Sequence, residues 1–316
     1  MKMPLQRRQG QLLVRLAFCL IGLSAVMPSS RAIAGCAASS GSVLFGVVDV
    51  LPATAIDVTS SLSVTCSSVT GQQRLCVSIG RGSAGDAVSR QLVGSGGSIR
   101  FDLYEDAART QLWGSWWSGW DTAGLQLDVP GNGTYSINIY GRLFGSQQQA
   151  IPGSYNSTIA DVVMQWGTAS GLPCPTGAAA TSNIVVTAKV SSSCAIGAST
   201  LDFGSVPSLN SAVPGATTLQ VQCSNTVPYV VSLDGGTAGA ADPSARKMTQ
   251  ASGRISYGLY QDPAHTQPWG NRAGVNTKSA TGAGTSQPMA VYGLVPAQPT
   301  PSPGAYTDTI VATVTY

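Results

Sequence analysis

The chain contains two similar copies of one sequence pattern, and this repeat constrains its fold more than any other feature. Residues 99–114 read IRFDLYEDAARTQLWG and align without a gap with residues 255–270, which read ISYGLYQDPAHTQPWG. A second match pairs GSYNSTI at 153–159 with GAYTDTI at 304–310, and a third pairs the segments GCAASSGSVLFG and SCAIGASTLDFG. Self-similarity at a fixed spacing is the signature of a repeated structural unit. We therefore expect two copies of one domain.

Short segments of alternating apolar and polar residues, separated by Gly and Pro, predict an all-β chain built as two tandem immunoglobulin-like β-sandwiches. In the second copy the predicted strands lie near Thr200–Gly204, Thr217–Cys223, Tyr229–Leu233, Arg254–Tyr260, Gln287–Leu294 and Thr307–Tyr316. The first copy has the matching six, the sixth near Asn156–Trp166, and then a seventh at Ser182–Val190. We expect the first sandwich to be complete. The second lacks its last strand, and we expect it to borrow one from another chain.

The first 34 residues have the pattern of a secretory signal peptide. Arg7, Arg8 and Arg15 flank the apolar stretch Leu16–Val26, and Ala32-Ile33-Ala34 is a typical small-residue cleavage site. The expected domains are then a signal peptide at 1–34, a self-complete domain at 35–190 and a strand-accepting domain at 191–316. After cleavage only Gly35 precedes Cys36. Such a subunit would accept a strand without donating one, and we expect it to end a polymer.

Cleavage after Ala34 would remove Cys19 and five of the 17 basic residues, leaving 12 basic against 14 acidic residues and a net charge of −2. Sparse charge without a basic stripe argues against a nucleic-acid partner. Six cysteines in an exported chain predict three disulfides. The repeat pairs Cys36 with Cys66 and Cys194 with Cys223, and it leaves Cys76 to pair with Cys174. No metal, cofactor or catalytic constellation is expected, because Asp106, Asp121 and Asp128 fit ordinary turns and His265 lacks a partner.

Four of the six tryptophans lie in QLWGSWWSGWD, residues 111–121. Trp113 aligns with Trp269, which predicts a shared structural role, and Trp166 closes a strand and is expected in the core. Trp116, Trp117 and Trp120 have no aromatic counterpart in the second copy. We expect them to form an exposed binding cluster, although they could instead fold inward over the end of the sandwich. We also expect the loops at 67–74, 110–133 and 167–181 to converge at one end, braced by Cys76–Cys174.

The paired cysteines at the domain starts, the stretch Y-x-D-x-x-x-T-Q-x-W-G and the segment G-x-Y-x-D-T-I-x-A-T-V-T-Y (304–316) resemble spore coat protein U domains, the pilin fold of archaic (Csu-type) chaperone–usher pili. The two-domain plan is similar to the tip adhesin of those fibres. The resemblance implies secretion through the periplasm to the cell surface, at the pilus tip. It also implies that a periplasmic chaperone holds the last strand through Ile310, Ala312, Val314 and Tyr316. An outer-membrane usher would then exchange the chaperone for the donor strand of an adjacent pilin.

Three functions remain open from the sequence. The first is a tip adhesin that attaches the cell to abiotic or host surfaces by hydrophobic contact through Trp116, Trp117, Trp120, Leu172 and Pro173. The second is a glycan-binding adhesin, in which the same rings stack on sugars beside polar groups such as Gln111 or Asp121. The third is a structural subunit without a receptor, either an initiating minor pilin or a spore-coat-type protein, whose tryptophans belong to the core.

Overall fold

The computed structural model describes residues 35–86, 89–116, 122–169, 174 and 179–316. Within these residues the regular structure is entirely β-strand, and no helix is long and apolar enough to cross a membrane. Buried apolar side chains form two separate clusters, one between Cys36 and Val190 and the other between Leu209 and Val295. We call the surrounding parts the N-terminal sandwich (residues 35–190) and the C-terminal sandwich (residues 194–316).

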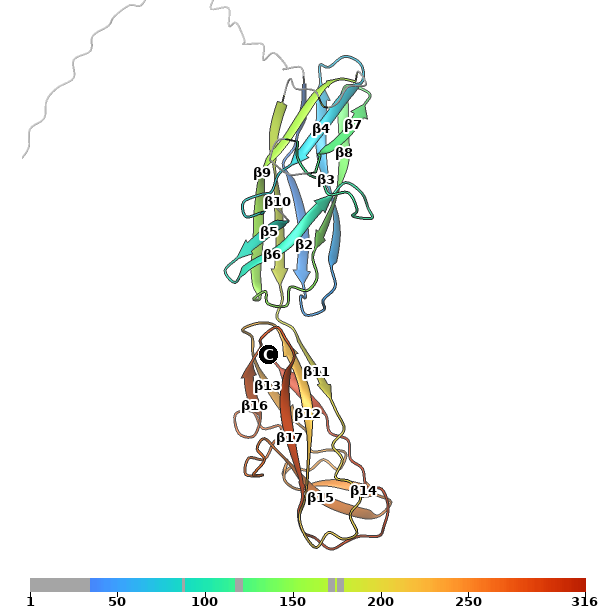
Figure 1. Cartoon of the computed structure of the whole chain (residues 1–316), viewed down its shortest axis with the longest axis vertical. Helices are drawn as coiled ribbons and strands as arrows, with labels where there is room; N and C mark the ends of the chain where they lie inside the picture. Colours follow the sequence, from blue (N-terminus) through green and yellow to red (C-terminus); the bar gives the residue numbers. More distant parts are fainter. Residues whose placement is uncertain (1–34, 87–88, 117–121, 170–173, 175–178) are drawn as a thin grey trace, which may run out of the picture. The chain divides into compact units, whose positions relative to one another are not determined.

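The N-terminal sandwich is one hydrogen-bonded sheet that curls over so that its halves face each other (Figure 1). Its strands are β1 (Gly35–Ala38), β2 (Gly41–Val48), β3 (Ile56–Ser67), β4 (Gln73–Ile79), β5 (Arg90–Gly94), β6 (Gly97–Tyr104), β7 (Leu125–Val129), β8 (Gly133–Leu143), β9 (Gly153–Thr168) and β10 (Ala179–Val190). They follow the order β1-β3-β8-β6-β5-β9-β10-β2, and β4 pairs with both β7 and β9. The pairs are antiparallel except for β10 with β2, which run parallel.

The C-terminal sandwich repeats this plan with two sheets, ordered β11-β12-β17-β15-β14 and β16-β13-β18. Its strands are β11 (Cys194–Ala198), β12 (Val213–Cys223), β13 (Pro228–Leu233), β14 (Arg246–Gln250), β15 (Gly253–Tyr260), β16 (Lys278–Thr281), β17 (Gln287–Val295) and β18 (Ala312–Thr315). In chain order these correspond to β1 and then to β3 through β9. Among the described residues, β2 and β10 therefore have no strand counterpart in the C-terminal sandwich.

The predicted strand at Thr200–Gly204 is wrong, and its counterpart in the other copy explains why. The corresponding residues of the first copy form β2, which pairs only with β10. Residues 199–206 follow a similar path, since Gly204 has a φ of 75° where Gly46 of β2 has 73°. Without a strand like β10 beside them, these residues have no ladder partner and remain irregular.

All three predicted disulfides are present: Cys36–Cys66, Cys76–Cys174 and Cys194–Cys223. The first and third join residues that lie directly opposite each other on adjacent strands at the start of each sandwich. Their equivalence confirms the repeat at the level of tertiary structure.

Two tryptophans anchor the two cores in the same way. Trp113 donates its indole N–H to the carbonyl of Val77 at 2.8 Å, and Trp269 donates to the carbonyl of Val231 at 3.0 Å. Each indole is fully buried, as a large aromatic ring with a satisfied N–H can be. The shared structural role predicted for this pair is therefore confirmed.

A buried arginine donates a hydrogen bond to the backbone of each of these tryptophans. Arg90 Nη2 donates to the carbonyl of Trp113 at 2.7 Å, and Arg246 Nη2 donates to the carbonyl of Trp269 at 2.8 Å. Both guanidinium groups are buried and bond several carbonyl oxygens at the end of the neighbouring strand. Burial of such a charge is tolerated only when its donors are satisfied, so these arginines are part of the framework.

Candidate functional site

The edge of β9 in the N-terminal sandwich differs from the corresponding edge of β18 in the C-terminal sandwich. In the N-terminal sandwich β10 lies between β9 and β2, with Ile184 opposite both Ile159 and Gly41. Successive strand residues face opposite sides of a sheet, and from Ile184 onward the inward residues of β10 are all buried: Ile184, Val186, Ala188 and Val190. The outward residue Val185 is exposed. Strand β10 therefore seals this edge and contributes a row of apolar side chains to the core.

The corresponding edge of the C-terminal sandwich is open. Strand β18 pairs with β13, and in the described part of the chain no strand is hydrogen-bonded to its other edge. The segment before it keeps the register of the repeat, because the bridge between Thr249 and Thr307 matches the pairing of Val93 with Asn156. Three of the predicted interface residues, Ile310, Ala312 and Val314, face the core and are half-buried, and Tyr316 is 58% exposed.

Every inward position along this edge is less covered than its counterpart. Tyr155 and Ile159 of β9 are buried, whereas Tyr306 and Ile310 at the same repeat positions are half-buried. Residues across the edge show the same difference. Val43 and Phe45 of β2 are buried, while their counterparts are half-buried: Leu201 and Phe203. Apolar side chains on both sides of this edge are thus partly accessible in the C-terminal sandwich. In the N-terminal sandwich the equivalent side chains are covered by β10.

Two carboxylates hold the segment before β18 in addition to the backbone bridge between Thr249 and Thr307. Asp308 Oδ1 accepts hydrogen bonds from the backbone N–H and hydroxyl of Thr237 at 2.8 and 2.7 Å, and its Oδ2 accepts one from the Tyr257 hydroxyl at 2.7 Å. Asp234 accepts from the backbone N–H of Val311 at 3.0 Å. Burial raises the pKa of the Asp308 carboxyl, but the bonds from Thr237, Tyr257 and Thr309 outweigh it and hold the pKa below its usual range.

Sequence reasoning missed Asp308 as a site residue. Its signal is the difference between the matched segments GSYNSTI and GAYTDTI, in which Asp308 replaces the fully buried Ser157. A carboxylate on the inward face of a strand is uncommon unless it is hydrogen-bonded.

The second candidate surface lies over the outer face of β4. Leu75, Val77 and Ile79 face the core, so Cys76 and Ser78 face the opposite side. Trp116, which is 37% exposed, donates its backbone N–H to the Ser78 hydroxyl at 3.3 Å, and Cys174 is bonded to Cys76. Residues two apart on one strand are about 7 Å apart. The two connections that carry the predicted surface-binding residues are therefore attached side by side.

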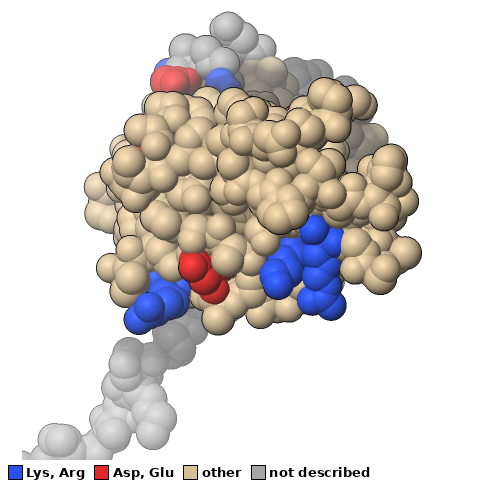
Figure 2. Space-filling model, turned by 90° about the horizontal axis from the view of Figure 1, so that it is seen from below, with Lys and Arg blue, Asp and Glu red and all other residues tan. Residues whose placement is uncertain are grey.

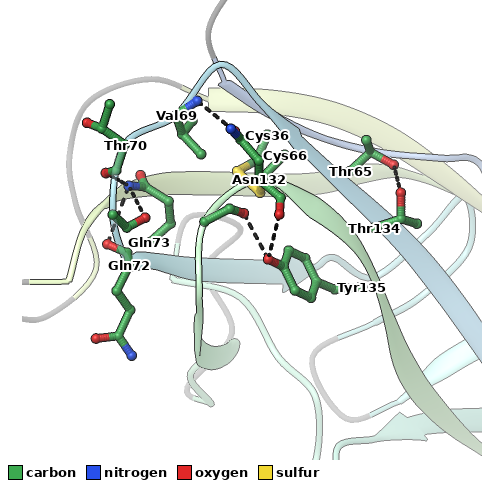
Figure 3. Close-up of a disulfide and its surroundings, with 12 residues drawn as sticks. Cys36, Thr65, Cys66, Val69, Thr70, Gln72, Gln73, Asn132, Thr134 and Tyr135 are labelled. Carbon is green, nitrogen blue, oxygen red and sulfur yellow. Dashed lines mark hydrogen bonds between the residues drawn. A yellow bond between two sulfur atoms is a disulfide. The ribbon is translucent and has the colours of Figure 1, made fainter.

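The predicted convergence of three loops at one end is wrong in one respect. The β3–β4 and β7–β8 turns meet, since Val69 donates to Asn132 at 2.9 Å (Figure 3). The end of β9 joins them, since Gln73 pairs with Thr168. The connection between β6 and β7 (residues 105–124), which we call the tryptophan connection, is instead attached through Trp116 beside Ser78. Ser78 lies five residues along β4 from Gln73, or about 17 Å at roughly 3.3 Å per residue. The position of this connection follows from Trp113, which must enter the core beside Val77.

Four predicted surface-binding residues lie outside the described residues: Trp117, Trp120, Leu172 and Pro173. Trp166 is half-buried and packs against the N-terminal core, in line with the expected core role.

Among the described residues near this surface, Arg74 and Asp128 form an ion pair. Arg74 donates to both oxygens of Asp128 at 2.7 and 2.8 Å, and the hydrogen bonds hold the pKa of Asp128 below its usual range. On another face of the molecule, a few Lys, Arg, Asp and Glu side chains stand among uncharged residues (Figure 2). The face drawn in Figure 2 shows no dense positive charge of the kind that binds a polyanion.

Comparison with known proteins places the repeat in a family. A family model for the Spore Coat Protein U domain matches residues 23–161 and again residues 180–313. The chain belongs to this family. The curated relative Protein U of Myxococcus xanthus is 37% identical over 155 residues, which cover 44% of this chain and 86% of that protein. Each half of the chain is thus one Spore Coat Protein U domain.

A solved structure has a similar fold across both domains. It is a chain of the CsuC–CsuE chaperone–tip adhesion subunit pre-assembly complex from archaic chaperone–usher Csu pili of Acinetobacter baumannii. The match covers 89% of this chain and 100% of that chain, with a TM-score of 0.56 and 18% sequence identity.

The limits of the two family matches also bear on β10. The first match ends at residue 161, within β9, and the second begins at residue 180, at the start of β10. By the family pattern, β10 belongs to the leading segment of the second Spore Coat Protein U domain, although it is packed into the first. One domain's leading segment thus completes the sandwich of the other.

Proposed function

We propose that the chain is a subunit of a chaperone–usher pilus whose C-terminal sandwich is completed by a strand from another chain. The observation that carries this proposal is the contrast between β9, sealed by β10, and β18, which is open. An unpaired edge above partly exposed apolar side chains favours addition of a strand. The leading segment of an adjacent Spore Coat Protein U subunit would pair with β18 in the way that β10 pairs with β9. Before assembly, a periplasmic chaperone would cover Ile310, Ala312, Val314 and Tyr316, and the usher would direct the exchange.

We further propose that the subunit is secreted to the cell surface and stands at the pilus tip as an adhesin. In the N-terminal sandwich β10 seals the edge that corresponds to that of β18, so this edge is not available to a donor strand, which suits a terminal position. The chain with a similar fold comes from a complex of a chaperone with a tip adhesion subunit, which supports this assignment.

Attachment would use the tryptophan connection over β4, with Trp116, Trp117 and Trp120 as its main contacts. If three indoles each bury about 100 Å² against a surface, the gross gain is about 7 kcal/mol at roughly 25 cal/mol per Å². Orientation and ordering costs remove much of that for one molecule. Many pili acting together restore strong attachment through avidity.

The experiment that tests this proposal is the triple substitution Trp116→Ser, Trp117→Ser and Trp120→Ser in the full chain, expressed with its pilus system. We expect normal numbers of pili by electron microscopy and loss of attachment to a hydrophobic surface. Leu44→Ser with Val47→Ser is the matched control, because these β2 side chains are 62% and 70% exposed on the same sandwich.

Unchanged attachment by the tryptophan variant would reject the adhesive role. Competition of wild-type attachment by one saccharide, without loss of binding to plastic, would favour the glycan-binding alternative.

A further inference from the structure

Strand β10 provides an internal template for the strand that the C-terminal sandwich accepts, an inference that rests on the proposed function. In the N-terminal sandwich Val186 lies opposite Ser157, and Val190 lies opposite Gly153. The repeat places Asp308 at the position of Ser157 and Gly304 at the position of Gly153. A strand that binds in the same register would therefore put one inward side chain against Asp308.

The two template positions differ in chemistry. Ser157 is a small, fully buried hydroxyl 3.3 Å from the hydroxyl of Ser83, and a valine packs beside it without leaving a charge uncovered. Asp308 is a half-buried carboxylate. Its Oδ1 accepts three hydrogen bonds, whereas its Oδ2 accepts one, from Tyr257. A carboxylate oxygen can accept two, so Oδ2 retains capacity for a further donor.

The charge of Asp308 has a counterpart in the core. In the N-terminal sandwich, Arg90 donates to the buried Asp102 at 3.3 Å. Gly258 replaces Asp102 in the second copy, and Arg246 bonds carbonyl oxygens instead. Burial lowers the pKa of Arg246, and nearby negative charges, Asp308 among them, oppose this shift. Asp102, the carboxylate that pairs with Arg90, thus has no counterpart at the same position of β15, and Asp308 is one of several acidic side chains whose charge acts on Arg246.

Covering Asp308 with an aliphatic side chain would take this carboxylate out of water without a new partner. That desolvation is costly for a charged group. Cβ atoms of directly opposed residues on antiparallel strands lie about 4.5–5.5 Å apart. A hydroxyl or ammonium on the incoming strand can therefore reach Oδ2.

We propose that Asp308 determines which strand the C-terminal sandwich accepts, by requiring a hydrogen-bond donor such as Ser, Thr or Lys at the position that β10 fills with Val186. Asp308 is a specificity residue of the edge in addition to an anchor of the segment before β18.

The test uses the full chain and three fluorescein-labelled peptides, with affinity measured by fluorescence anisotropy. The first peptide is SNIVVTAKV, the sequence of Ser182–Val190. The second carries Val186→Thr, which adds a hydroxyl at nearly unchanged shape. The third is the matched control with Val190→Thr, which places the same hydroxyl opposite Gly304. The protein variant Asp308→Ser introduces the residue that the first copy has at this position.

We expect the Val186→Thr peptide to bind the wild-type chain at least about tenfold more tightly than SNIVVTAKV, the lower end of the range for one charge-assisted hydrogen bond. The Val190→Thr peptide should bind no better than SNIVVTAKV. Asp308→Ser should abolish the preference for Val186→Thr while SNIVVTAKV still binds, which identifies a coupling between two residues. In Asp308→Asn, which keeps the size but removes the charge, the preference should fall to about threefold or less.

An equal loss of affinity for all three peptides in both Asp308 variants would overturn the inference, since Asp308 would then act only as an anchor. A wild-type chain that binds the three peptides equally would also overturn it, while leaving strand acceptance intact. Failure of every peptide to bind the wild-type chain would instead overturn the proposed function.

Discussion

Ile184 of β10 lies directly opposite Ile159 of β9, and both side chains are fully buried. The pair joins a strand that the family pattern assigns to the second domain to the core of the first. Strand β10 therefore contributes buried apolar side chains to the core of the N-terminal sandwich.

Replacing Ile184 with alanine should destabilise the N-terminal sandwich by about 2–5 kcal/mol, the usual cost of deleting a buried aliphatic side chain. The matched control is Val185→Ala at the adjacent exposed position, which should cost less than about 1 kcal/mol. Urea unfolding of the full chain, followed by hydrogen exchange of β9 peptides, measures both. Equal effects of the two substitutions would contradict the role assigned to β10.

The twin tryptophans predict equivalent effects in the two cores. Trp113→Phe and Trp269→Phe each remove an indole N–H and leave the carbonyl of Val77 or Val231 without that donor. Each substitution should cost about 1–3 kcal/mol in its own sandwich only. Hydrogen exchange resolved by peptide separates the two sandwiches. Loss of protection in the sandwich that was not altered would show that the two cores are energetically coupled.

Glu105 predicts a pH dependence of the N-terminal sandwich. Burial, aided by the charge of Asp106, raises the pKa of Glu105 to about 7. The folded state then binds the proton more tightly than the unfolded state, so this group's stabilising contribution is complete below pH 4.5 and is lost as the pH rises through about 7. Glu105→Gln should have a higher Tm than wild type at pH 8, and the difference should shrink at pH 5. A constant difference at both pH values would contradict this assignment.

The disulfide Cys76–Cys174 predicts a link between stability and attachment. It closes a separation of 98 residues and fastens one connection to the outer face of β4, beside Trp116. The double substitution Cys76→Ser and Cys174→Ser should lower the free energy of unfolding by about 2–5 kcal/mol. It should also weaken attachment while pili still assemble. Cys194→Ser with Cys223→Ser is the comparison, because that disulfide lies in the other sandwich and should alter assembly instead.

The repeat and the period-two pattern predicted the all-β fold, the three disulfides, the role of Trp113 and the strand at Ser182–Val190. These features depend on local alternation or on direct comparison of the two copies. Residues 200–204 were predicted as a strand because their sequence alternates apolar and polar residues. Their counterpart, strand β2, forms by pairing with β10, and residues 200–204 have no such partner among the described residues.

The attachment of the tryptophan connection beside Ser78 was missed for a similar reason. Trp113 fixes it by entering the core halfway along β4, and sequence periodicity does not encode that depth. Asp308 could have been noticed from the repeat, but its importance depends on the register of an edge that only the fold defines.

The most direct test of the account extends the full chain after Tyr316 with a ten-residue Gly/Ser linker, matching the connection at 169–178, and a copy of Ala179–Val190. Hydrogen exchange of residues 304–316 is then compared in the extended and original chains. The account predicts slow exchange in the extended chain, fast exchange in the original, and a higher Tm for the C-terminal sandwich. Identical exchange of this segment in both chains would contradict the claim that its edge accepts a strand.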